Sequence, residues 1–152
     1  MPRHCWRYSD GIPVVEVGFQ LADASGRVKR TLEVDCGASG GVTSFVLDEE
    51  TANLLGIADG PPVRDMDANG NVAIRRTVWA LVDMRQLNLR EPMLAKCYPR
   101  APGAHQGLAT LNSLDGYFTR WCGEQDAGGA RRFCLQRGDR EPDRDEREHH
   151  AR

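Results

Sequence analysis

The first part of the chain alternates hydrophobic and polar side chains with a period of two. Residues 13–22 follow this pattern from Val15 to Leu21, which is typical of a strand with one buried face. Residues 27–34 repeat it after a polar connection that contains glycine. The two runs together predict a β-hairpin whose second strand leads directly to Asp35.

Further strands and turns are predicted downstream of this hairpin. Residues 35–41, DCGASGG, form a glycine-rich turn, and the run VTSFV at 42–46 predicts a short strand leaving it. The sequence DANG at 67–70 predicts a tight turn between two strands, because Asn and Gly tolerate positive φ angles. Another strand is expected over 87–98, and a last hairpin over 121–136.

Two segments have the pattern of short helices. Residues 48–56 offer Asp48 as an N-cap, acidic residues in the first turn and a glycine at the end. Residues 110–121 predict a second short helix, capped by Thr110 or Asn112. Many short strands with glycine turns and at most two short helices indicate an all-β protein, either a barrel or a sandwich.

Length and composition predict one folded domain with a polar tail. The 152 residues lie within the size range of a single domain. We expect an N-terminal arm at 1–11, a folded domain at 12–136 and a charged tail at 137–152. The tail has no aliphatic side chain larger than alanine, so it cannot bury enough apolar surface to fold and should be disordered.

The net charge, the lack of apolar segments and the spacing of the cysteines indicate which partners and which cellular compartment to expect. The formal net charge is −2 with both signs mixed along the chain, which argues against nucleic-acid binding. Residues 1–17 lack the apolar run of a signal peptide, and no later segment approaches the ~20 apolar residues of a membrane span. We therefore expect a cytoplasmic protein without a membrane partner. The five cysteines are widely spaced, so reduced thiols are expected rather than a disulfide framework or a zinc site.

The segment around Asp35 carries the most specific chemical signal. An apolar strand leads into Asp35 and the small residues that follow it, and a second apolar strand begins at Val42. This segment resembles the active-site loop of the retropepsin-like aspartic proteases, in which an apolar strand leads into Asp-Thr/Ser-Gly-Ala. The resemblance extends over about residues 12–136. It includes, in order, the N-terminal hairpin, the aspartate loop, a short helix, a flap-like hairpin and a late helix before a terminal strand pair.

The resemblance implies a closed β-barrel with a flap hairpin, acting as a homodimeric aspartic endopeptidase. Two carboxylates close together cannot both ionise cheaply, so the pair holds one proton and serves as base and acid around a water molecule. Since the chain has one such loop, the second Asp35 would come from a second copy. No cofactor or metal is implied. The resemblance assigns catalysis to Asp35 and contact with a polypeptide substrate to Gly37, Ala38, Ser39, Met66, Ala68, Asn69 and Gly70.

Two positions that brace the loop in this family differ here. Cys36 stands where the family has Thr or Ser, and a thiol is a weaker hydrogen-bond donor than a hydroxyl. Two copies of Cys36 near a dimer axis are also candidates for an oxidative link. Thr110 stands where the family has Gly, so its branched side chain either displaces the loop or caps the following helix.

Several alternatives stay open beside this hypothesis. The same barrel without catalytic activity can serve as a dimerisation or peptide-binding module. The glycine-rich segment 37–41 lacks both common phosphate-binding patterns. Cys97 and His105 offer a nucleophile and a base, but the loop between them provides no third group to orient the base. His149 and His150 lie in the charged tail, where solvated side chains are more usual than metal ligands.

Overall fold

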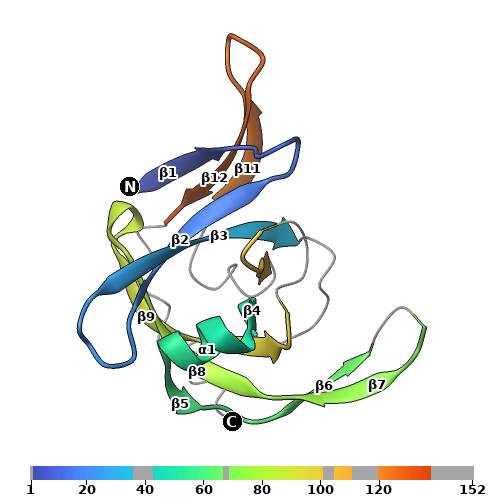
Figure 1. Cartoon of the computed structure of the whole chain (residues 1–152). Helices are drawn as coiled ribbons and strands as arrows, with labels where there is room; N and C mark the ends of the chain where they lie inside the picture. The colour runs from blue at the N-terminus through green and yellow to red at the C-terminus, as the bar shows by residue number, and fades with distance from the viewer. Residues whose placement is uncertain (1, 36–42, 67–68, 101–104, 111–119, 138–152) are drawn as a thin grey trace, which may run out of the picture.

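The computed structural model describes residues 2–35, 43–66, 69–100, 105–110 and 120–137. These segments form mostly strands, with one short α-helix and one 3-10 helix among them (Figure 1). The elements are β1 (Arg3–Arg7), β2 (Val14–Gln20), β3 (Arg27–Asp35), β4 (Phe45–Asp48), α1 (Glu49–Leu55), β5 (Gly56–Asp59), β6 (Val63–Met66), β7 (Val72–Arg75), β8 (Thr77–Met84), η1 (Arg85–Leu87), β9 (Leu89–Tyr98), β10 (Leu108–Thr110), β11 (Arg120–Gln125) and β12 (Arg131–Gln136).

Six strands form a closed barrel in the order β2–β3–β10–β4–β9–β8, and β8 pairs back with β2 at Phe19 and Val82. The close approach at this seam requires glycine, because a Cβ at Gly18 would lie 2.3 Å from the carbonyl oxygen of Asp83. The Arg27 guanidinium donates to the same oxygen at 2.7 Å. The predicted all-β class is confirmed, and the barrel rather than the sandwich is the architecture observed.

The barrel interior is filled by the apolar residues of the alternating segments. Val15, Val17 and Phe19 of β2 are at most 2% exposed, whereas Glu16 between them is partly exposed. Phe19 contacts Phe45 of β4 edge to face, with ring centroids 5.4 Å apart. The period-of-two pattern therefore predicts both the strands and the face that each strand buries.

Helix α1 confirms the helix predicted over 48–56. The Asp48 carboxylate accepts a hydrogen bond from the Thr51 backbone N–H at 2.6 Å, as expected of an N-cap. The helix ends before Gly56, where the chain turns into extended backbone and continues directly as β5. The glycine thus stops the helix without adopting the left-handed conformation common at helix ends.

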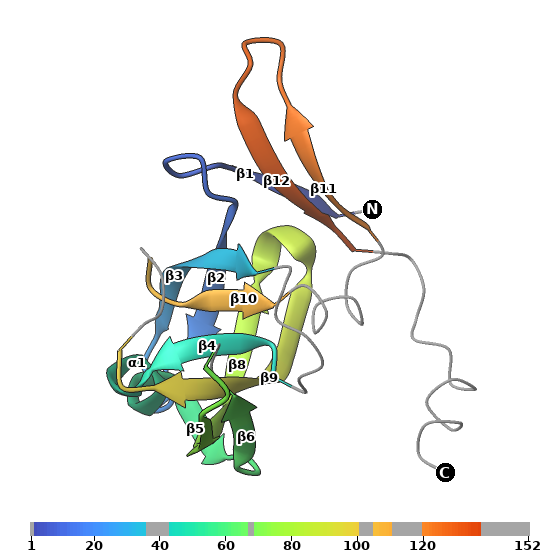
Figure 2. The same ribbon diagram turned by 90° about the vertical axis from the view of Figure 1, so that its right-hand side faces the viewer.

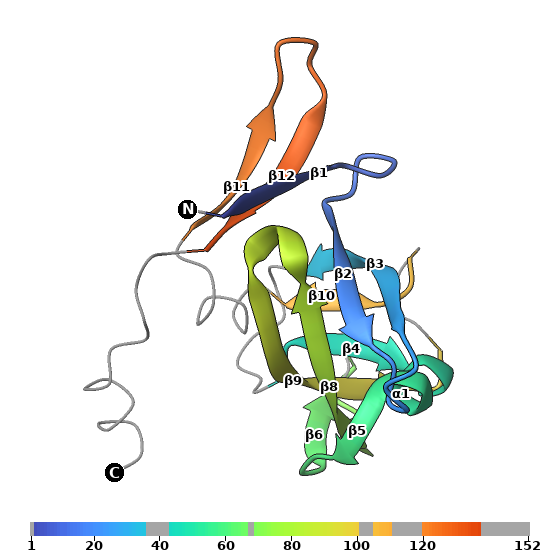
Figure 3. The same ribbon diagram turned by 90° about the vertical axis from the view of Figure 1, so that its left-hand side faces the viewer.

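A three-stranded antiparallel sheet, ordered β1–β12–β11, lies at one end of the barrel, and the turn of its β11–β12 hairpin points away from it (Figures 2 and 3). Phe133 and Leu135 of β12 belong to the same buried cluster as the barrel core, and Trp6 packs against that cluster. The hairpin predicted over 121–136 is confirmed. Residues 1–11, expected to form an arm, contain β1, which pairs with β12.

Strands β6 and β7 form a separate antiparallel hairpin that projects from the barrel (Figure 1). This confirms the hairpin predicted around 67–70. Gly70 in its turn has a φ of +82°, a conformation that glycine adopts at little cost. Met66, Val72 and Ile74 share one face of the hairpin and are between 49% and 68% exposed.

The segments predicted as a second helix and as a tail are covered only in part by the described residues. Thr110, the first residue of the predicted helix, is the last residue of β10, and Arg120 is the first residue of β11. Arg137, the first residue of the predicted tail, donates its backbone N–H to the Pro2 carbonyl oxygen at 2.9 Å. The rest of both segments lies outside the described part. Among the described residues, no helix has the length and apolar character needed to cross a membrane.

A disulfide between Cys5 and Cys134 links β1 to β12. The prediction of five reduced thiols is therefore wrong for this pair. Spacing along the chain gives no indication of it, because the two residues are 129 positions apart and meet only when β1 pairs with β12. Cys97 is a free and buried thiol.

Candidate active site

Asp35 is the last residue of β3, at the point where the chain enters the glycine-rich segment 36–42. Strand β10 runs parallel to β3 and antiparallel to β4, so it lies between the strands that enter and leave this segment. The register places Thr110 of β10 directly beside Asp35. A strand from the second half of the chain therefore pairs with both β3, which ends at Asp35, and β4.

Hydrogen bonds from Thr110 hold the chain where it leaves the loop. The Thr110 backbone N–H donates to the Ser44 carbonyl oxygen at 3.0 Å. The Thr110 hydroxyl donates to the Thr43 carbonyl oxygen at 3.0 Å. The same hydroxyl lies 3.3 Å from the Ser44 carbonyl oxygen. All three residues are 5% exposed. Water cannot readily replace these bonds, so their loss would leave buried carbonyl groups unsatisfied.

Gly107 allows β10 to enter between its two neighbours. Its φ is +140°, and a Cβ at this position would lie 2.3 Å from the Val46 carbonyl oxygen. The Gly107 carbonyl oxygen accepts a hydrogen bond from the Glu33 N–H at 2.9 Å. Both the conformation and the available space require glycine. Residue 107 therefore fixes the approach of β10 to the two strands beside the loop.

The structure brings together some of the residues predicted for the site and leaves others apart. Asp35 and Thr110 lie side by side on adjacent strands. Met66, Asn69 and Gly70 belong to the β6–β7 hairpin, which forms a sheet of its own. The other predicted residues lie outside the described part of the chain; they are Cys36, Gly37, Ala38, Ser39 and Ala68.

A charged cluster at the base of the β6–β7 hairpin is not predicted by the sequence. The Asp65 carboxylate accepts hydrogen bonds from the Tyr98 hydroxyl and from Lys96 Nζ, the latter at 3.0 Å. Arg75 Nε lies 3.6 Å from the same carboxylate, and the Arg75 guanidinium lies 4.4 Å from the centroid of the Tyr98 ring. These contacts tie both strands of the hairpin to β9.

The cluster shifts the pKa values of its two acidic groups in opposite directions. Burial raises the pKa of Asp65, but hydrogen bonds from Tyr98 and Lys96 and the neighbouring positive charges outweigh burial, so this pKa lies below its usual 3.8. Burial and the hydrogen bond to Asp65 raise the pKa of Tyr98 to about 12. Asp65 is therefore charged and Tyr98 neutral from mildly acidic to alkaline pH. Alternation places Asp65 and Arg75 on one face of the hairpin, but no feature of the sequence connects them to Tyr98.

Comparison with known proteins does not identify a family or a function for this chain. The chain matches no family model, no curated protein and no solved structure. Its function is therefore inferred from Asp35 and the strands that position it. A single carboxylate is not sufficient to hydrolyse a peptide bond by acid–base catalysis with two carboxyl groups. In a dimer with two-fold symmetry, however, the same residue comes from each subunit, so a second carboxylate can be present at the interface.

The alternative nucleophile, Cys97, has an unsuitable environment. It lies in the barrel core and is 2% exposed. Burial, and then the nearby Glu49 carboxylate, raise the pKa of its thiol. A buried and protonated thiol is a poor nucleophile, so the pairing of Cys97 with His105 is not supported.

Proposed function

We propose that the protein is an aspartic endopeptidase that hydrolyses peptide bonds as a homodimer, with one catalytic Asp35 from each subunit. The observation that carries the proposal is the position of Asp35 at the end of β3, with β10 inserted between β3 and β4. A catalytic group must be held on rigid elements to act reproducibly. Here β10 pairs with β3, which ends at Asp35, and with β4.

The proposed chemistry needs two Asp35 side chains around one water molecule. Like charges in close contact disfavour double ionisation, so the pair carries a single proton. The ionised member accepts a proton from the attacking water, and the protonated member donates to the oxygen of the scissile carbonyl. No metal or cofactor takes part in these steps.

The β6–β7 hairpin fits the role of a flap over the substrate. Its exposed face carries the apolar residues Met66, Val72 and Ile74, which suit contact with apolar side chains of a polypeptide. Its base is tied to β9 through Asp65 and Tyr98. The small residues at 37–39 would let a substrate backbone approach the two aspartates.

Replacement of Asp35 by asparagine tests the proposal. Asparagine preserves the shape of the side chain but cannot exchange the proton, so cleavage of an unbiased peptide library should fall at least ~10²-fold. Asp10→Asn is a matched control, because Asp10 lies in an exposed turn with a φ of +50° that asparagine also tolerates. Products would be identified by mass spectrometry, and circular dichroism would verify that each variant is folded.

The outcomes separate the enzyme from its non-catalytic alternative. The proposal holds if the wild type and Asp10→Asn cleave peptides and Asp35→Asn does not. Equal cleavage by Asp35→Asn would overturn it. A folded wild-type dimer that binds peptides without cleaving them would instead support the reading as a dimerisation or peptide-binding module.

A further inference from the structure

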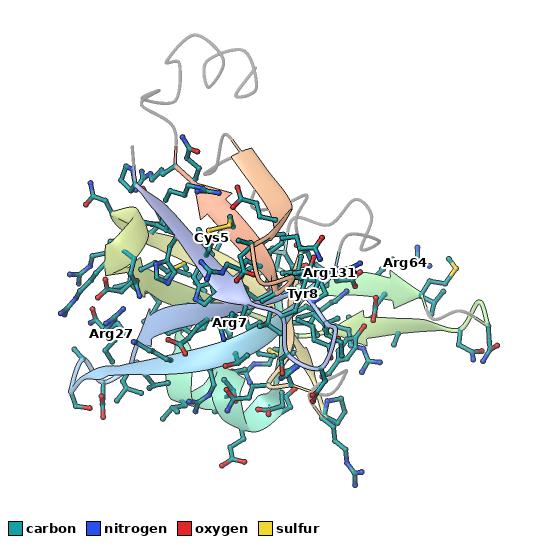
Figure 4. The ribbon with its side chains drawn as sticks, turned by 90° about the horizontal axis from the view of Figure 1, so that it is seen from above. Cys5, Arg7, Tyr8, Arg27, Arg64 and Arg131 are labelled. Carbon is teal, nitrogen blue, oxygen red and sulfur yellow. A yellow bond between two sulfur atoms is a disulfide. The ribbon has the colours of Figure 1, made fainter. Side chains whose placement is uncertain are left out.

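Three side chains of the kinds that bind metal ions meet on the three-stranded sheet at the end of the barrel. They are Cys5 of β1, Cys134 of β12 and Glu124 of β11, and their sulfur and carboxylate oxygen atoms lie within 4.8 Å of one another. Each strand of this sheet, ordered β1–β12–β11, therefore contributes one residue. Figure 4 shows the disulfide that joins Cys5 to Cys134. The proposed peptidase chemistry uses none of the three.

The strand register explains why these side chains meet. Cys5 is directly opposite Cys134, and their Cα atoms are 4.1 Å apart. Glu124 is directly opposite Arg132, which is two residues from Cys134 on β12. Residues two apart in a strand project from the same face of a sheet, as do residues directly opposite each other on neighbouring strands. All three side chains therefore lie on one face of the sheet.

The donor atoms define the class of ion that they suit. Thiolates favour borderline or soft ions such as Zn²⁺, which carboxylates also bind, whereas Mg²⁺ and Ca²⁺ prefer oxygen ligands alone. Zn²⁺ is usually tetrahedral, so two thiolates and one carboxylate leave its fourth position for water. Because thiolates are the ligands, the set becomes complete only when the bond between Cys5 and Cys134 is reduced.

We propose that reduction of the Cys5–Cys134 disulfide creates a binding site for Zn²⁺, held by the two cysteine thiolates and the Glu124 carboxylate. The site is a redox-controlled alternative to the disulfide. In the oxidised protein a covalent bond joins β1 to β12. In the reduced protein the metal ion joins the same two strands and adds β11.

A dithiol is the chemical class of reductant that the step requires. Its thiolate attacks Cys5 Sγ, which is partly exposed, whereas Cys134 is 1% exposed. The Cys134 thiol leaves as a mixed disulfide forms, and the second thiolate of the reductant then displaces Cys5 and closes a cyclic disulfide. Two electrons and two protons thus pass from the dithiol to the cysteines. Zn²⁺ binds the two sulfurs as thiolates and releases both protons to solvent.

Charge at the site favours an ion over its absence in the reduced protein. Two thiolates beside the Glu124 carboxylate would place three negative charges together, and like charges disfavour ionisation. A divalent cation neutralises two of the three. The Arg3 guanidinium pairs with Glu124 and offsets the third. A carboxylate has two oxygens with several acceptor positions, so Glu124 can bind the ion while Arg3 fixes its orientation.

The geometry requires only small movements of side chains. Ligand atoms around tetrahedral Zn²⁺, with bonds of about 2.0–2.3 Å, lie roughly 3.3–3.8 Å from one another. Once the disulfide is broken, rotation about the Cα–Cβ bond of either cysteine separates the sulfurs to this extent. Glu124 is exposed and Cys5 partly exposed, so the ion enters from the side of Glu124. Cys134 forms the buried end of the site.

Cobalt provides a direct probe of the reduced full-length protein, because Co²⁺ bound to thiolates absorbs in the near ultraviolet. The protein would be reduced with a dithiol, freed of it without oxygen and titrated with Co²⁺. We expect one Co²⁺ per chain, with a thiolate charge-transfer band that Zn²⁺ abolishes because Zn²⁺ binds more tightly. In weak buffer near neutral pH, binding of Zn²⁺ should release about two protons per ion. The oxidised protein should show neither signal.

Substitutions assign the ligands. Cys5→Ser should lose the cobalt band, and Cys97→Ser should keep it, since Cys97 is buried in the barrel core. Glu124→Gln should bind Zn²⁺ at least ~10-fold more weakly, because even the loss of an outer-shell partner costs ~10–100-fold in metal affinity. Glu16→Gln is the matched control, since Glu16 is also an exposed acidic residue on a strand and pairs with Lys29.

The results that would overturn the proposal are equally specific. One is a reduced wild type without the cobalt band, and another is a band of equal strength in the oxidised protein. Equal Zn²⁺ affinities of Glu124→Gln and Glu16→Gln would exclude the carboxylate as a ligand, and a band that persists in Cys5→Ser would exclude that cysteine. The wild-type titrations and the exposed Glu124 position decide the question even if Cys5→Ser fails to fold. None of these readouts depends on peptidase activity.

Discussion

Thr110 forms buried hydrogen bonds to Thr43 and Ser44, the two residues that come directly before β4. In the retropepsin-like pattern this position is glycine, and a threonine brings a hydroxyl that must be satisfied if it is buried. The structure provides the Thr43 carbonyl oxygen at 3.0 Å as its acceptor. The sequence left open whether Thr110 displaces the loop or caps a helix. The bond to Thr43 gives its hydroxyl a role at the exit of the loop.

Replacing Thr110 by valine should weaken both stability and cleavage. In the variant, the buried Thr43 carbonyl oxygen loses its hydrogen bond from the Thr110 hydroxyl. We expect this loss to lower the free energy of unfolding by about 1–3 kcal/mol. Thr77→Val is a matched control, because Thr77 is fully buried and its hydroxyl donates to the Pro61 carbonyl oxygen at 2.8 Å, in a different part of the barrel. Denaturant unfolding and kcat/KM would be measured for both.

We expect a smaller loss of stability for Thr77→Val, because its acceptor belongs to the exposed residue Pro61 and water can replace the lost bond. We expect a larger loss of kcat/KM for Thr110→Val. Equal kcat/KM values would show that the bond to Thr43 supports only the fold. The comparison separates an effect on the proposed site from an effect on general stability, since both variants remove one buried hydroxyl.

Tyr98 should titrate at unusually high pH. Its pKa is raised from 10.0 to about 12, so the folded state holds the phenolic proton more tightly than the unfolded state. The resulting stabilisation is fully present below pH 10 and is lost as the pH rises toward 12. Phenolate absorbance of the folded protein should therefore show one late-titrating tyrosine that Tyr98→Phe removes. Asp65→Asn should lower the pKa of Tyr98, and an unchanged titration would contradict the hydrogen bond between them.

At the scale of elements, local pattern predicts the parts that adjacent residues determine. The β2–β3 hairpin, helix α1 and the β6–β7 hairpin follow from alternation, capping and the Asn-Gly turn. The insertion of β10 between β3 and β4 does not, because the paired residues lie far apart in the chain, Thr110 beside Asp35 and Leu108 beside Val46, and local alternation carries no information about such distant pairing. The pairing of β1 with β12, and the disulfide it carries, escape prediction for the same reason.

Gly107→Ala tests the insertion of β10 directly. The added Cβ would lie 2.3 Å from the Val46 carbonyl oxygen, and the φ of +140° would strain any other residue. We expect a loss of about 1–3 kcal/mol in the free energy of unfolding, together with a loss of cleavage. Gly26→Ala is the control, since its Cβ would meet only a Leu21 side-chain atom at 3.8 Å. A Gly107→Ala protein as stable and as active as Gly26→Ala would contradict the described path of β10.

At the scale of the whole molecule, the barrel closes around a core to which the alternating runs contribute Val15, Phe19 and Leu32 among others. The closure itself depends on Gly18 and on the bonds between Arg27 and Asp83, which no local pattern indicates. In the candidate site, too, local sequence predicts some features and only the structure shows others. Asp35 stands out by its turn and flanking strands, and the resemblance also points to Thr110. The hydrogen-bond partners of Thr110, however, follow only from the register of β10.

The proposed site is complete only in a dimer. Each chain supplies one Asp35, so the active species should have twice the chain mass of 16.9 kDa. Sedimentation or light scattering at the concentration used for cleavage would measure this mass. A protein that is strictly monomeric while cleaving peptides would contradict the shared pair of carboxylates.

Mixing wild-type and Asp35→Asn chains tests the central claim most directly. Equal amounts would be unfolded and refolded together, so that the two chains combine at random, and cleavage would be compared with that of wild type at the same total concentration. If both aspartates are required, mixed dimers are inactive and activity falls to about a quarter. A fall to only about half would mean that each subunit acts with its own Asp35 alone, and would contradict the account.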